Sequence, residues 1–254
     1  MPPAPRTAID IPLPEAEIAA LARRWKRVNG PVISTLNRFG GKLEAQIAVL
    51  PDALRRRIES ATEQALSAAY GAARRGARHL PAQDRKGTLA AAMAAGAAGG
   101  AGGIATALAE LPFTVTILLH AIRREAEAAG FDPDDPWIRA ECLRCFSAGS
   151  PAAADDGIDT SFFSARLTLT GPAVQRLIAT VAPRLSAALG QKLAAQAVPV
   201  LGAASGAALN AAFLRYYRET AAIRFALLRL AQEHGAAPVL EAFARQTDRP
   251  RLRT

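Results

Sequence analysis

Apolar and polar residues alternate with a helical period along most of the chain. Between Pro51 and Pro81, apolar residues recur at intervals of three or four: Leu54, Ile58, Ala61, Ala65, Ala69 and Ala72. This spacing is typical of one face of an α-helix. The same pattern, bounded by Pro, Gly and Asn, predicts further helices over residues 15–28, 32–50, 132–148, 171–185, 211–233 and 235–246. No stretch shows the period of two that a strand requires, so the sequence predicts an all-α fold.

Two proline motifs mark helix starts within this pattern. Asp132–Pro136 reads DPDDP, in which an Asp can cap the helix and Pro136 can occupy its first position. Gly171-Pro172 opens a helix whose apolar face continues past Pro183. Pro112 likewise predicts a helix that begins there.

Two runs without charge interrupt the amphipathic pattern. Residues 87–109 read GTLAAAMAAGAAGGAGGIATALA, and residues 193–214 read LAAQAVPVLGAASGAALNAAFL. Each could span a bilayer at about 1.5 Å per residue, but neither contains many large apolar side chains. Both contain glycines four residues apart, a spacing that lets a second helix approach closely. These close-packing candidates are Gly96, Gly99, Gly100, Gly103, Gly202 and Gly206.

We therefore expect a single multi-helix bundle with Ala/Gly-rich, close-packed helical hairpins at its centre. A helical hairpin buried in a soluble domain is the favoured interpretation, because alanine and glycine contribute little to membrane insertion. Association with a membrane surface and a transmembrane pair remain as alternatives. Glycine costs a helix about 1 kcal/mol relative to alanine, so these runs need tight tertiary partners.

The chain divides into one domain with two extensions. Residues 1–14 contain five prolines and predict an extended arm, residues 15–246 predict the helical domain, and residues 247–254 form a basic tail. Residues 149–157, GSPAAADDG, are a possible hinge. The absence of an apolar leader and the presence of just two cysteines favour the cytoplasm, with a peripheral position at the inner face of the membrane as a variant.

The net charge of +9 is distributed unevenly along the chain. Residues 1–109 carry 15 Lys and Arg against 8 Asp and Glu, residues 110–170 carry 5 against 10, and residues 171–254 carry 11 against 4. The basic segments favour an anionic membrane surface, a lipid or a membrane protein as partner. Nucleic acid is not expected, because no recognisable binding module appears. The candidate residues for an anionic surface are Arg23, Arg24, Lys26, Arg27, Arg55, Arg56, Arg57, Arg74, Arg75 and Arg78.

Glu110 is the one formally charged residue between Lys86 and Arg123, in an otherwise apolar region. It could cap a helix that starts at Pro112, or it could form a buried ion pair with Arg166. His120 follows ten residues later, which is about 15 Å along a helix, so the two form no direct acid–base pair. The candidate polar residues, structural or functional, are Glu110, Thr114, His120, Arg166, Gln196 and Asn210.

No motif identifies an enzyme, a cofactor site or a metal site. Cys142 and Cys145 fall inside a predicted helix rather than at its start, so they are interpreted as small buried side chains. The three histidines lack the paired spacing of metal ligands, and the acidic loop at 155–159 lacks the pattern of a calcium loop. No phosphate-binding loop, dinucleotide fingerprint or nucleophile elbow is present.

Three segments resemble the EcsC family of bacterial proteins. They are AELPFTVT at 109–116, FFSAR at 162–166, and AAQAVPVLGAASG at 194–206 with Asn210 and Phe213 beyond it. The resemblance covers roughly residues 30–235 and departs from the family pattern at Phe113 and Ser205. It implies a helical protein of no agreed activity, from a family named for a neighbourhood with an ABC-type transporter.

The expected function is therefore a non-enzymatic, membrane-associated accessory protein that binds lipid or acts with such a transporter. The alternative is a hydrolase or lipid-modifying enzyme that uses Glu110, His120 and Arg166. This alternative requires the three side chains to line one pocket. A nucleic-acid-binding protein ranks third.

Overall fold

The computed structural model of the chain is all-α, as the sequence predicts. It describes residues 12–28, 51–74, 85–101, 103–147, 171–196 and 202–247. The helices in these ranges are α1 (Glu15–Arg27), α4 (Asp52–Arg74), α5 (Arg85–Ala101), α6 (Gly103–Ala128), α7 (Pro136–Arg144), α8 (Gly171–Gln196), α9 (Gly202–His234) and α10 (Ala236–Thr247). A 3-10 turn, Cys145–Ser147, extends α7.

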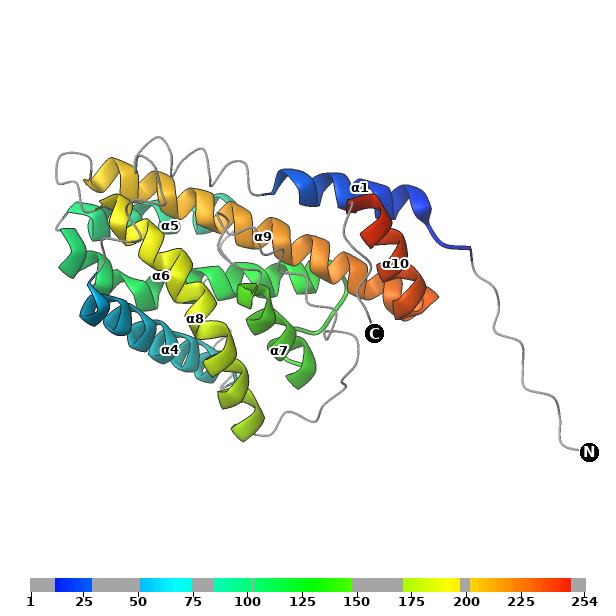
Figure 1. Cartoon of the computed structure of the whole chain (residues 1–254), viewed down its shortest axis with the longest axis horizontal. Coiled ribbons are helices and arrows are strands. Elements are labelled where there is room, and N and C mark those ends of the chain that lie inside the picture. Colours follow the sequence, from blue (N-terminus) through cyan, green and yellow to red (C-terminus); the bar gives the residue numbers. More distant parts are fainter. Residues whose placement is uncertain are drawn as a thin grey trace, which may run out of the picture.

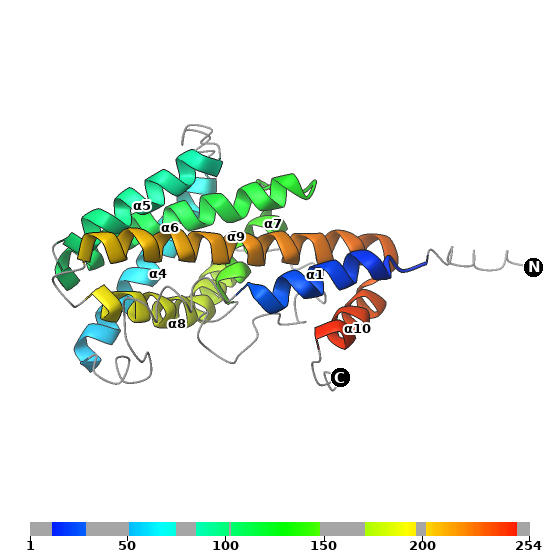
Figure 2. The same ribbon diagram turned by 90° about the horizontal axis from the view of Figure 1, so that it is seen from above.

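The long helix α9 runs through the length of the bundle and contacts most of the other helices (Figures 1 and 2). Its first half packs against α5 and α6, α4 packs on α6 and α8, and the end of α8 lies beside the start of α9. Its second half packs against α1 and α10. The start of α4, the end of α5, the start of α6, the end of α8 and the start of α9 all lie at the left end of the molecule in both views.

Two hydrophobic cores hold these helices together. The larger core contains residues of all the described helices from α4 through α9, with fully buried side chains such as Leu66, Leu118 and Phe213. A smaller core joins α1, α10 and the second half of α9 and includes Ile18 and Phe243. Because α9 contributes to both cores, it is the element that connects them.

The predicted start of α7 is confirmed in detail. Asp135 is the N-cap, and its Oδ1 accepts hydrogen bonds from the backbone N–H of Trp137 at 2.8 Å and of Ile138 at 3.2 Å. Pro136 occupies the first helical position, where its missing N–H would have no partner inside the helix. The predicted helix starts at Glu15, Asp52 and Gly171 are confirmed as well.

The predicted helix start at Pro112 is wrong. Pro112 lies inside α6, which continues from Gly103 to Ala128. A proline inside a helix removes one backbone hydrogen bond, which costs about 3 kcal/mol. Here the helix continues because Ala107, Leu111 and Val115 are fully buried around the proline, while Pro112 itself faces outward. Tertiary packing of this face outweighs the local signal.

Each uncharged run is divided between two helices. The first is split where α5 ends at Ala101 and α6 begins at Gly103, and the second where α8 ends at Gln196 and α9 begins at Gly202. The helix predicted at residues 211–233 therefore begins nine residues earlier. Within the described residues, one segment, Ala105–Ala128, has the length and mean hydropathy of a membrane span, and 56% of its 18-residue apolar window is buried in the fold. The core helix of a soluble protein has the same properties.

The close packing predicted from the glycines occurs where α5 crosses α9. A Cβ atom on Gly96 would lie 2.1 Å from the carbonyl oxygen of Gly206, so the two backbones touch. Gly100 is also buried, and Gly103 and Gly202 are the first residues of α6 and α9. The Ala/Gly-rich parts of α5 and α9 are therefore in close backbone contact.

Several predictions fall outside the described residues. These are the arm at residues 1–11, the helix at 32–50, Arg75 and Arg78, the hinge at 149–157, Arg166, and the basic tail from residue 248 onward.

Candidate functional site

Glu110 lies in the first third of α6, and its carboxylate is buried against α8. The side chain of Lys192, near the end of α8, is fully buried, and its Nζ lies 2.8 Å from Glu110 Oε2. Burial lowers the pKa of Lys192 from its ordinary value, and the charge and hydrogen bond of Glu110 oppose that effect. The pair joins two helices inside the core.

The second carboxylate oxygen of Glu110 binds two neutral side chains. Asn210 Nδ2, from α9, donates to Oε1 at 2.8 Å and also to the backbone carbonyl of Ala92, in α5, at 2.9 Å. The hydroxyl of Thr114, one turn along α6, donates to the same Oε1. Lys192, Thr114, Asn210 and Glu110 form a cluster that links α5, α6, α8 and α9, hereafter the Glu110 cluster.

Gly99 makes room for the carboxylate of this cluster. A Cβ atom at Gly99 would lie 2.6 Å from Glu110 Oε2, the oxygen that binds Lys192. The carbonyl of Gly99 accepts a hydrogen bond from the hydroxyl of Thr106 at 2.7 Å, which ties α5 to the first turn of α6. The glycine predicted to pack helices thus also admits a buried charge.

The Glu110 cluster holds α5, α6, α8 and α9 together. Glu110 receives hydrogen bonds from three donors and has a charged partner, as a buried carboxylate requires. The predicted cap at Pro112 is wrong, because Glu110 lies inside α6 rather than before it. Its cationic partner within the described part of the chain is Lys192, and Arg166, the partner considered from the sequence, lies outside the described residues.

His120 does not belong to this cluster. It lies on the same continuous helix, ten residues and about 15 Å beyond Glu110. It is half-buried, and burial together with the nearby charges of Arg124 and Arg123 lowers its pKa. Its Nε2 has no hydrogen-bond partner within the described residues.

Gln196, another candidate polar residue from the sequence, is the last residue of α8 and lies four residues beyond Lys192.

Sequence reasoning missed Lys192, although the chain contains a signal for it. Lys192 is the one formally charged residue between Arg184 and Arg215, as Glu110 is between Lys86 and Arg123. A single charge in each of two apolar segments predicts that the two meet, because a buried charge needs a partner. The presence of both Glu110 and Lys192, rather than either residue alone, therefore predicts the buried ion pair.

The two cysteines are buried and unpaired, as expected from the sequence. Burial raises the pKa of the Cys142 thiol well above its ordinary value and raises that of Cys145 to about 12. Next to them, buried Glu141 accepts hydrogen bonds from Arg224 Nη2 at 3.1 Å and from Arg144. Within the described residues, no group of three His, Cys, Asp or Glu side chains could hold a metal.

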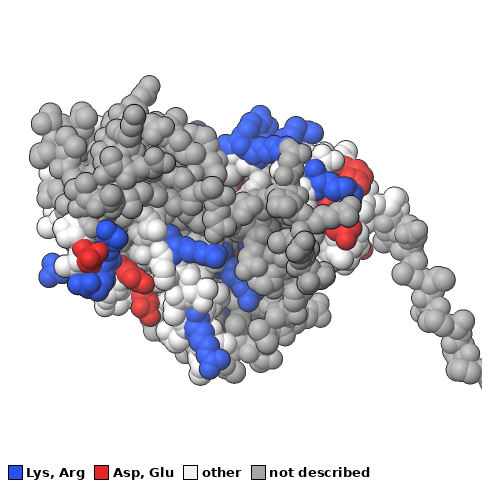
Figure 3. All heavy atoms as spheres, viewed as in Figure 1, with Lys and Arg blue, Asp and Glu red and all other residues white. Residues whose placement is uncertain are grey.

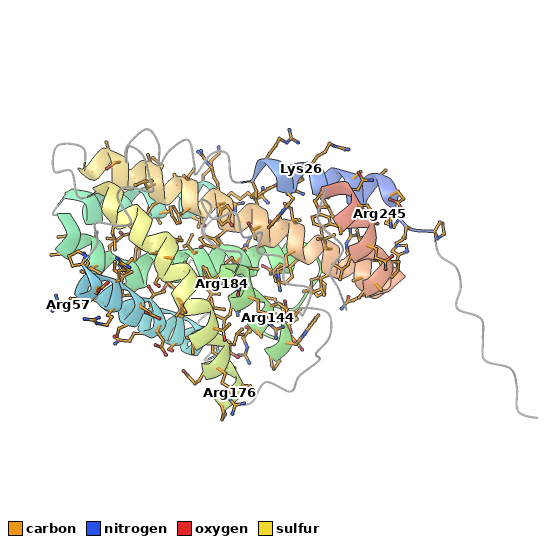
Figure 4. The ribbon with its side chains drawn as sticks, in the orientation of Figure 1. Lys26, Arg57, Arg144, Arg176, Arg184 and Arg245 are labelled. Carbon is orange, nitrogen blue, oxygen red and sulfur yellow. The ribbon has the colours of Figure 1, made fainter. Side chains whose placement is uncertain are left out.

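Exposed basic residues gather on α1 and on the first turns of α4 (Figure 3). Arg55, Arg56 and Arg57 are exposed, and Arg57 projects from the left end of the molecule (Figure 4). On α1, Arg23, Lys26 and Arg27 are exposed, whereas Arg24 is half-buried in a bidentate pair with Glu219. Arg74 is the last residue of α4.

Large apolar side chains are also exposed on the α5–α6 hairpin. Met93 on α5 is 41% exposed and Phe113 on α6 is 53% exposed. Met93 lies eight residues before the end of α5 and Phe113 ten residues after the start of α6, so the two are at a similar level of the hairpin.

A family model described as the EcsC protein family matches residues 75–230. The match covers α5 to most of α9, including every member of the Glu110 cluster. It begins later than the resemblance inferred from the sequence segments, so α4 lies outside the match, as α1 does. Comparisons with curated proteins and with solved structures give no match.

Proposed function

The chain belongs to the EcsC protein family, and we propose that it is a non-enzymatic protein that associates with anionic membrane surfaces. The apolar side of the α5–α6 hairpin and the arginines of α4 form the proposed contact surface. Because α4 packs on α6, the two features belong to neighbouring helices at one end of the bundle.

The exposed, uncharged side of the hairpin is the observation that carries the proposal. Beyond Arg85 and Lys86, which are exposed at the start of α5, the exposed residues of α5 and of the first half of α6 have small or apolar side chains. Besides Met93 and Phe113 they are Ala90, Ala94, Ala98, Ala101, Ala105, Thr106, Ala109 and Pro112. Soluble proteins seldom leave large apolar patches in water without a binding role. A Phe and a Met among alanines suit shallow insertion below lipid headgroups.

The arginines at the start of α4 supply the electrostatic part. Arg55, Arg56 and Arg57 are exposed, and Arg55 has Asp52 at 3.7 Å as a partly neutralising neighbour. Each basic residue near an anionic membrane contributes about 1 kcal/mol. Three of them would strengthen binding by about a hundredfold, and salt would weaken this part.

Sedimentation with vesicles tests the proposal. We expect the protein to bind vesicles of phosphatidylglycerol in low salt and to bind pure phosphatidylcholine less well. The triple variant Arg55→Gln, Arg56→Gln, Arg57→Gln is expected to lose at least about tenfold in affinity for the anionic vesicles. Phe113→Ser with Met93→Ser is expected to weaken the binding that persists in high salt.

A matched charge control is available on other faces. Arg124, Arg176 and Arg184 are exposed and lie outside the proposed surface, and Arg176 is at the lower tip of α8 (Figure 4). The triple Gln variant of these residues removes the same charge and is expected to bind nearly as tightly as the wild type. Equal losses for the two triple variants, or no sedimentation of the wild type, would contradict the proposal.

The structure offers no support for the enzyme alternative. Glu110 is occupied by three donors, and His120 is about 15 Å away along the same helix. Arg166, the third residue of that hypothesis, lies outside the described residues. If the partner is a membrane transporter, sedimentation should show binding to native membranes and no binding to protein-free vesicles.

A further inference from the structure

A pocket of about 440 Å³ lies between α1, α5, α6 and α9, away from both the Glu110 cluster and the α4 arginines. Its volume is within the range of small-molecule sites in proteins. Five arginines and two glutamates line it, and Val28, Tyr216 and Ala222 complete the wall. The charged residues are Arg24, Arg27, Arg85, Arg215, Arg218, Glu125 and Glu219. Five positive charges against two negative ones leave the lining with a formal balance of +3.

The two glutamates are already bound by part of this set. Glu219 receives Arg24 Nε at 2.6 Å and Arg24 Nη2 at 3.0 Å. Glu125 is buried, and its Oε1 receives Nε and Nη2 of Arg218, both at 3.1 Å. Arg85 is largely exposed and reaches both oxygens of Glu125 at the longer distance of 3.4 Å.

Among the described residues, two of these guanidinium groups, those of Arg27 and Arg215, have no carboxylate partner. Arg215 is exposed and forms no ion pair within the described part of the chain. Arg27 is exposed too, and its Nε donates to the backbone carbonyl of Arg23 at 3.2 Å, which leaves its charge uncompensated by any described acid. Folding thus brings together cations from the last turn of α1 and from the middle of α9, which sequence separation alone would not predict.

We propose that this pocket binds a phosphate group of a small anionic ligand. Planar guanidinium groups donate pairs of hydrogen bonds that match phosphate oxygens, so Arg27 and Arg215 are the expected primary contacts. Arg85 can turn from its long contact with Glu125 to the ligand. The phosphate belongs either to a soluble compound or to a lipid headgroup, and the test separates these two sources.

Titration calorimetry with pyrophosphate tests the soluble source, and flotation with phosphatidic acid vesicles tests the headgroup source. The variant Arg27→Gln, Arg215→Gln is expected to lose at least tenfold in affinity for whichever probe binds. Its melting temperature without ligand should not fall, because neither guanidinium group is paired with a described acid. Glu219→Gln is expected to raise the affinity for the same probe, because it removes a carboxylate that repels the anion and releases Arg24.

The control variant Arg23→Gln, Arg176→Gln removes the same charge from exposed positions outside the pocket. Pyrophosphate binding that the pocket variant weakens and the control does not would support a soluble ligand. The same pattern with vesicles alone would support a lipid headgroup. Equal effects of the two variants, or no binding of either probe, would overturn this proposal. Neither result would contradict the proposed contact surface of the α5–α6 hairpin and the α4 arginines.

Discussion

At the scale of single residues, Glu110 and Lys192 show how a buried charge constrains a helical bundle. The exposed fraction of each side chain is below one tenth, and each is the single charge in its apolar segment. Removing one partner leaves the other charge buried without compensation, which typically costs about 3–5 kcal/mol. Replacing both can cost much less, because no charge remains buried.

We therefore expect Glu110→Gln and Lys192→Met each to lower the free energy of unfolding by about 3–5 kcal/mol. The double variant should lose less than the sum of the two, because the residues act as a unit. Urea unfolding measures all three. The exposed pair of Arg229 and Glu17 is the control, and Arg229→Gln should cost less than about 1 kcal/mol. Strictly additive losses would contradict a direct ion pair.

Sequence reasoning identified part of the Glu110 cluster and considered both a cap and a buried ion pair for it, of which the ion pair occurs, with Lys192. Glu110, Thr114 and Asn210 were selected from the sequence and do meet. The capping role failed because it depended on a helix start at Pro112, and a local proline signal cannot report the packing of α6. Lys192 was missed because its partner is 82 residues away, and the pairing becomes visible when two distant segments are considered together.

At the scale of helices, local sequence signals predicted where a helix begins better than they predicted whether it continues. The Asp135 cap and Pro136 act within one turn of backbone, so the start of α7 could be predicted from five residues. The two uncharged runs gave no local signal for where one helix ends and the next begins. Their glycines predicted close packing, but which helices pack together depends on residues more than a hundred positions apart.

The crossing of α5 and α9 gives a prediction whose sign distinguishes packing from helix propensity. Gly96→Ala would stabilise an isolated helix by about 1 kcal/mol. In the bundle, the new Cβ atom meets a backbone carbonyl at 2.1 Å, and overpacking typically costs about 1–3 kcal/mol. We expect a net loss of stability in thermal unfolding.

Ala98→Gly on the exposed side of α5 is the control for this crossing. It should lose about 1 kcal/mol from propensity alone. A Gly96→Ala variant more stable than the wild type would show that the two backbones are not in contact.

At the scale of the whole molecule, α9 joins two cores of unequal size. Its 33 residues extend about 50 Å, which is enough to serve both. The smaller core contains α1, α10 and the last turns of α9, and Arg24 and Arg229 add ion pairs to Glu219 and Glu17 across the α1–α9 contact. A small core of this kind can open without unfolding the rest.

Phe243→Ala should therefore destabilise one part of the molecule selectively. Phe243 is almost fully buried in the smaller core, and a buried Phe→Ala change costs about 3–5 kcal/mol. We expect faster hydrogen exchange in α1 and α10, with protection in α4, α5 and α6 unchanged. Phe213→Ala, in the larger core, is the comparison and should accelerate exchange throughout the bundle. A uniform effect of Phe243→Ala would contradict two separable cores.

The contact between Gly96 and Gly206 also has a consequence for how related sequences diverge. Two side chains in contact can exchange sizes during evolution, so their positions covary. Here the atom nearest to a substituent on Gly96 is a main-chain carbonyl oxygen, which every residue at position 206 retains. No substitution on α9 compensates for a larger residue on α5. In family members that keep this crossing, position 96 should therefore remain glycine without a covarying partner.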